Sequence, residues 1–129
     1  MKKIIALLFV AIFSTAVFTF AAEEAKPELR PAQKIMQARA AWLTAMSENL
    51  GAKKFEAVTR DADELAAQAK KVGENFPNPL GKELNLSISS LAKEISDAAA
   101  KQDGDTVKVR LGEIKSKCGE CHAKIRDKK

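Results

Sequence analysis

The amino-acid sequence predicts an all-α fold, an antiparallel four-helix bundle with up-down-up-down order. Four segments repeat apolar residues at alternating three- and four-residue steps, which is the spacing of one face of a helix. No long stretch alternates apolar and polar residues as a strand does when one face of its sheet is buried. Short breaks rich in glycine, asparagine and proline separate the segments, and short connections favour antiparallel neighbours.

The first two helices are predicted from about residue 32 to 50 and from about residue 55 to 72. The first helix has two neighbouring stripes, formed by Ile35, Trp42, Met46 and Asn49 and by Met36, Leu43 and Leu50. Gly51 is placed to end this helix. The second helix has a heptad seam of Phe55, Val58, Ala62, Leu65, Ala69 and Val72.

The third and fourth helices follow two further breaks. Gly73 and residues 75–79 interrupt the helical pattern and predict a loop. The third helix is predicted from about residue 80 to 101, and its seam contains Leu84, Ile88, Leu91, Ile95 and Ala98. Residues 102–104 form the next break. The seam of the fourth helix contains Val107, Leu111, Ile114, Cys118, Cys121 and Ile125.

Residues 1–22 have the pattern of a secretory signal peptide. Two lysines precede an apolar run over residues 4–20, and small residues follow ahead of an acidic pair. We expect cleavage after Ala21 or Ala22, which leaves residues 23–129 as one domain without a stable membrane anchor. The alternative is an uncleaved anchor, because the apolar run reaches the short limit of a membrane span.

The charge of the chain argues against nucleic acid as a partner. Loss of the two leader lysines lowers the formal net charge at pH 7 from +5 to +3. No interleaving of aromatic and basic residues is present, so we expect no nucleic-acid binding.

The residues Cys118-Gly119-Glu120-Cys121-His122 form the C-x-x-C-H pattern of covalent haem attachment. On a helix the two thiols face one side, where they can form thioethers with the haem vinyl groups while His122 binds the iron. The chain has two cysteines and one histidine, and all three lie in this pentapeptide. Because both cysteines belong to an apolar seam, we expect one haem c buried near one end of the bundle.

Three other interpretations of the pentapeptide are weaker. A thioredoxin-type cysteine pair lies at the start of a helix in a fold with strands, whereas this pair lies near the end of a helical pattern. A structural zinc site needs four protein ligands, and the chain offers three cysteine or histidine side chains. A disulfide within one helical turn would connect no distant part of the fold.

Bundle geometry indicates which side chain lies opposite His122. The start of the first helix and the end of the fourth lie at the same end, so Met36 is level with His122. Met46 lies ten residues further on, roughly 15 Å along the axis, and is expected in the core. Met36 is therefore the expected sixth iron ligand, since a thioether is an established axial ligand. Three cations are either partners of the haem propionates or solvated charges, namely Arg30, Lys34 and Arg39.

The chain resembles the class II c-type cytochromes, the cytochrome c prime family with its low-spin Met-ligated subgroup. The resemblance covers residues 23–129 and is most specific at Cys118-x-x-Cys121-His122-x-x-Ile125-Arg126, where Ile125 replaces the aromatic residue of the family ending. It implies thioethers at Cys118 and Cys121, His122 as the proximal iron ligand, and Arg126 beside the haem. It also agrees with Met36, because low-spin members bind iron through a methionine near the start of helix one.

These observations predict a periplasmic monohaem cytochrome that transfers electrons to and from redox partner proteins. The alternative is a five-coordinate cytochrome c prime-like protein that binds NO or CO, which requires Met36 to lie away from the iron. We expect no enzyme activity, because the chain has no second histidine, no tyrosine and no acidic pair on the seam of the fourth helix. Relatives often dimerise through their first two helices, which leaves a homodimer open.

Overall fold

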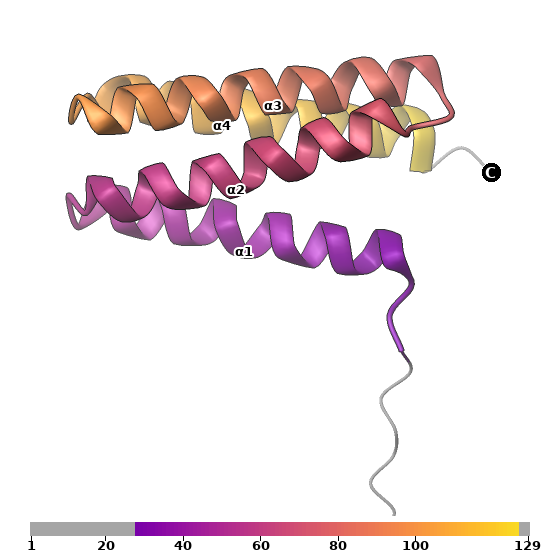
Figure 1. Ribbon diagram of the computed structural model, residues 1–129, viewed down its shortest axis with the longest axis horizontal. Coiled ribbons are helices and arrows are strands. Elements are labelled where there is room, and N and C mark those ends of the chain that lie inside the picture. The colour runs from indigo at the N-terminus through magenta and orange to yellow at the C-terminus, as the bar shows by residue number, and fades with distance from the viewer. Residues whose placement is uncertain (1–27, 127–129) are drawn as a thin grey trace, which may run out of the picture.

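The computed structural model describes residues 28–126, which form an all-α four-helix bundle (Figure 1). The helices are α1 (Pro31–Gly51), α2 (Phe55–Glu74), α3 (Pro79–Ala100) and α4 (Gly104–Cys121). A π-helical turn, η1 (His122–Arg126), continues directly from α4. Consecutive helices run in opposite directions and are joined by short turns (Figure 1), so the predicted fold class is confirmed.

The core consists of the apolar stripes that the helical spacing predicts. Met46, Val58, Leu65, Ile95 and Ile114 are among the side chains with no exposed surface. Alanines from α2 and α3 fill the space between these larger residues, which allows the two helices to pack closely. Trp42 is partly buried against this core and does not line the cavity described below.

Capping residues determine where α3 and α4 begin. The Asn78 side-chain oxygen accepts hydrogen bonds from the backbone N–H groups of Leu80 at 2.9 Å and Gly81 at 3.2 Å. Pro79 follows at the first helical position, where its missing N–H is not needed. Asp103 caps α4 by accepting from the backbone N–H of Thr106 at 3.1 Å.

Two boundary predictions require correction. Gly73 lies inside α2 and is buried, whereas the sequence predicts it in a loop. A Cβ at this position would approach the Leu86 side chain to 3.0 Å, so glycine is present for close packing of α2 against α3. The fourth helix also does not continue as an α-helix to Ile125, because it changes to π hydrogen bonding at His122. Apolar spacing alone did not distinguish these two helical forms.

The predicted signal peptide, residues 1–22, lies outside the described residues, and so does the lysine pair at the C-terminus. Among residues 28–126, none of the helices combines the length and the apolar character needed to span a membrane.

Candidate functional site

One end of the bundle contains a cavity of about 200 Å³ that is lined by the residues expected to bind or contact haem, namely Met36, Cys118, Cys121, His122 and Arg126. Met36 belongs to α1, Cys118 and Cys121 to the last turn of α4, and His122 and Arg126 to η1. These elements meet because the start of α1 and the end of α4 lie at the same end of the bundle (Figure 1).

The two thiols are placed for a common ligand. Cys118 and Cys121 are half-buried, unpaired with each other, and three residues apart on the side of α4 that lines the cavity. Burial raises the pKa of Cys118, and the nearby Arg39 guanidinium offsets part of this effect. Burial raises the pKa of Cys121 in the same way. Both are therefore neutral thiols at pH 7, unlike the low-pKa thiols of a redox-active C-x-x-C pair.

His122 lies where α4 changes to η1. Its backbone N–H donates to the carbonyl groups of Cys118 and Gly119, so the turn that carries both thiols also holds the histidine. The π-helical turn that follows keeps Ile125 and Arg126 at the cavity. Single π turns within α-helices occur frequently at functional sites.

Met36 and Met46 have different surroundings, as the sequence predicts. The Met36 side chain lines the cavity and is 38% exposed, whereas Met46 is fully buried in the core. Met36 is thus the methionine that lies at the same end of the bundle as His122. Within residues 28–126, no three His, Cys, Asp or Glu side chains form a group that could hold a metal ion. The sulfur atoms that line the cavity belong to Cys118, Cys121 and Met36.

Arg39 is buried in the wall of the cavity, although the sequence left open that it is a solvated charge. Its Nε donates to Gln68 Oε1 at 2.9 Å, and its Nη2 donates to Asn85 Oδ1 at 2.7 Å. Burial lowers the pKa of the guanidinium, and the neighbouring Cys118 and Cys121 oppose this. No carboxylate of the described residues forms an ion pair with Arg39.

Sequence reasoning missed this polar cluster, and a signal for it was present. Arg39 falls on the same helical stripe as Ile35, Trp42 and Met46 at steps of three and four residues. Asn85 likewise falls on the seam that contains Ile88. A polar side chain on an apolar stripe is expected to be buried, and a buried polar group requires a hydrogen-bond partner. Such positions in a sequence therefore indicate a buried polar cluster.

The remaining wall is apolar. Phe76, from the turn between α2 and α3, lines the cavity together with Ile88 of α3 and Ile125 of η1. The Phe76 ring lies directly against Gly81, where an added Cβ would collide with it. Glycine at the start of α3 therefore allows the ring to close one side of the cavity.

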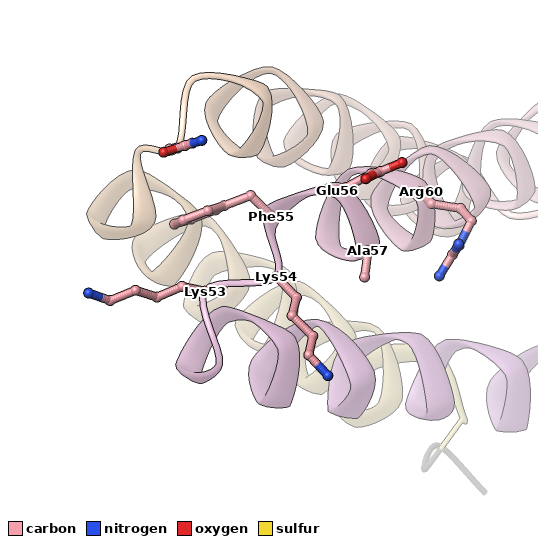
Figure 2. Close-up of a pocket in the computed structure, with 7 residues that line it drawn as sticks. Lys53, Lys54, Phe55, Glu56, Ala57 and Arg60 are labelled. Carbon is pink, nitrogen blue, oxygen red and sulfur yellow. The ribbon is translucent and has the colours of Figure 1, made fainter.

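Two further hollows in the surface are lined by different kinds of residue from one another. One, of about 720 Å³, shares Met36, His122 and Arg126 with the cavity and is also lined by Arg30. The other, of about 550 Å³, lies at the turn between α1 and α2, at the opposite end of the bundle (Figure 2). Lys53, Lys54 and Arg60, labelled in Figure 2, are among the residues that line this second hollow, and its lining contains no cysteine, histidine or methionine.

No known protein family, curated protein or solved structure was found to match the chain.

Proposed function

We propose that this chain is a periplasmic c-type cytochrome that transfers electrons through one covalently attached haem, with His122 and Met36 as axial iron ligands. One observation carries the proposal. Cys118, Cys121, His122 and Met36 line the same cavity, although α1 and α4 are the first and last helices of the described chain. These side chains supply the two thioether positions and two axial ligands that haem c requires.

The chemistry of the wall fits such a cofactor. Phe76, Ile88 and Ile125 offer apolar contact to a porphyrin ring. Arg39 is a buried cation without a carboxylate partner, which suits a ligand that brings carboxylates of its own. The enclosed volume of about 200 Å³ is below the ~300–1,000 Å³ of ordinary ligand sites, and the adjoining hollow lined by Met36 and His122 adds space.

Each residue would then have a defined role. Bound haem supplies an iron that alternates between two oxidation states. The sulfur atoms of Cys118 and Cys121 would hold the ring on α4 as thioethers, while His122 and Met36 would bind the iron from η1 and α1. The apolar side chains exclude water from the centre. Because helical backbone carries both ligands, little rearrangement would accompany electron transfer, and methionine ligation favours a higher reduction potential.

A second function, binding of NO or CO at a five-coordinate iron, is favoured by the position of Met36. This residue is 38% exposed and lies on α1, which packs against the other helices less closely than α2 packs against α3. If Met36 does not bind the iron, the distal side of the haem has a free position for a diatomic gas.

Absorption spectra of the purified protein in both oxidation states, with and without carbon monoxide, separate these functions. For electron transfer we expect covalent haem that survives acid-acetone extraction, a low-spin reduced spectrum and little reaction with carbon monoxide. A high-spin protein that binds carbon monoxide readily would establish the second function. A native protein without haem, with Cys118 and Cys121 joined as a disulfide, would refute both.

A further inference from the structure

Arg39 is a charged side chain that is buried in the protein, where a charge is unfavourable. It is 4% exposed, and its neighbours include the neutral thiols of Cys118 and Cys121. Removal of an ion from water is strongly unfavourable unless other groups compensate for it. In the proposed function Arg39 faces a ligand that brings its own carboxylates, and the effect of this charge on the redox centre itself is a separate question.

Two neutral amides hold this cation in place. Gln68 of α2 and Asn85 of α3 each accept one hydrogen bond from the guanidinium, which ties α1 to α2 and α3. The Asn85 amide nitrogen donates to the Gly81 carbonyl at 2.7 Å, which turns the Asn85 oxygen towards Arg39. A carboxylate at either position would cancel the positive charge, whereas the amides satisfy the donors and preserve it.

A fixed positive charge at the cavity wall has a consequence for a redox centre. Reduction adds an electron to the centre, and a nearby cation in a medium of low dielectric constant stabilises the added negative charge. Burial and hydrogen bonding around a haem are established means of adjusting its reduction potential.

We propose that Gln68 and Asn85 are positioning residues that hold the Arg39 charge at the cavity wall, and that this charge favours the reduced state of the bound centre. The inference rests on the proposed function, because it requires a redox-active cofactor in the cavity.

The variant Gln68→Glu tests this on the haem-bound protein. Glutamate keeps the shape of glutamine and the oxygen that accepts from Arg39 Nε, and it adds a charge that cancels that of the guanidinium. We expect a fall in the measured reduction potential, an unchanged ligand spectrum and no loss of thermal stability. Gln37→Glu is the matched control, because Gln37 is exposed on α1 and water screens the same added charge.

Asn85→Ala tests the positioning role separately. Loss of the Asn85 oxygen removes one of the two acceptors that hold the guanidinium, so the charge moves from the wall and the potential falls as well. Equal potentials in Gln68→Glu and Gln37→Glu would overturn the role of the Arg39 charge. An unchanged potential in Asn85→Ala would overturn the positioning role of Asn85. Either result, obtained on protein that carries covalent haem, leaves the proposed function intact, whereas wild-type protein without haem refutes the proposed function itself.

Discussion

At the scale of single residues, identical side chains have different roles according to their position along a helix. Met36 and Met46 both belong to α1, and ten residues place them roughly 15 Å apart along its axis. Met46 is fully buried among core residues, whereas Met36 is partly exposed at the cavity that contains His122. The position of each methionine along α1, and not its chemistry, therefore separates an expected iron ligand from a packing residue.

Replacement of Met36 by alanine should open the sixth coordination position. We expect Met36→Ala to give a high-spin haem that binds carbon monoxide readily and has a lower reduction potential, because the thioether ligand is lost. Met46→Ala is the control, and we expect it to cost about 2–5 kcal/mol of stability with an unchanged haem spectrum. Absorption spectra and thermal unfolding measure both effects. An unchanged spectrum in Met36→Ala would contradict the assignment of Met36 as a ligand.

At the scale of the helices, local contacts at the ends decide where each element begins. Asp103 accepts hydrogen bonds from the backbone N–H of Thr106 at 3.1 Å and from its hydroxyl at 2.6 Å. These bonds favour the ionised carboxylate, so they lower the pKa of Asp103 in the folded protein. The first turn of α4 is thereby stabilised at the end of the bundle opposite to the cysteines.

This capping interaction predicts a pH dependence. The pKa of Asp103 in the folded protein lies below its ordinary value. The stabilisation that the carboxylate gives to the folded state is therefore fully present above the ordinary pKa, and it is lost as the pH falls through the folded pKa. We expect Asp103→Ala to lower the melting temperature at pH 7, with a difference from wild type that shrinks below about pH 4. Asp103→Asn keeps a capping oxygen and serves as the control without titration. A difference that is independent of pH would argue against the carboxylate.

Two glycines should respond in opposite ways to alanine. A Cβ at Gly81 would collide with the Phe76 ring, so we expect Gly81→Ala to displace the ring from the cavity and cost about 1–3 kcal/mol. Gly112, inside α4, has open space around an added Cβ, so Gly112→Ala should stabilise the protein by about 0.5–1 kcal/mol through helix propensity. Chemical denaturation measures both changes. Equal effects at the two positions would show that Phe76 does not depend on Gly81.

At the scale of the whole molecule, the four helices do not contribute equally to the packing. The contacts of α2 with α3 are the most extensive, and those of α1 with α4 are the sparsest of the neighbouring pairs. Towards Pro31, α1 diverges from α2 (Figure 1), and in this half of α1 the one buried residue is Arg39. The proposed haem would join α1 to α4 through Met36 and the cysteines, where the protein's own contacts are fewest.

Hydrogen exchange should detect this connection. We expect the amides of α1 to exchange faster than those of α2 and α3 in the haem-free variant that carries Cys118→Ala and Cys121→Ala. In the haem-bound protein the protection of α1 should rise towards that of α2 and α3, because local opening then requires loss of the iron ligand. Exchange measured by mass spectrometry resolves each helix. Equal protection of α1 in the two forms would contradict a structural role for the haem.

The fold class, the approximate limits of the helices and the meeting of Met36, His122 and the two cysteines at one end of the bundle could be predicted from the sequence. Helical spacing identifies which faces are buried, and an up-down-up-down order then places Met36 and Cys118 at the same end. Haem attachment, electron transfer and the periplasmic location stay predictions from the C-x-x-C-H pattern and from residues 1–22.

The roles of individual residues on those faces depend on contacts between helices. Gly73 is a residue type that is common in loops, yet it lies inside α2, where the close approach of the Leu86 side chain favours a residue without a Cβ. Arginine is usually a surface residue, yet Arg39 is buried because Gln68 and Asn85 accept its hydrogen bonds. In both cases the partners belong to another helix, and the spacing of residues within one helix carries no information about what its neighbours provide.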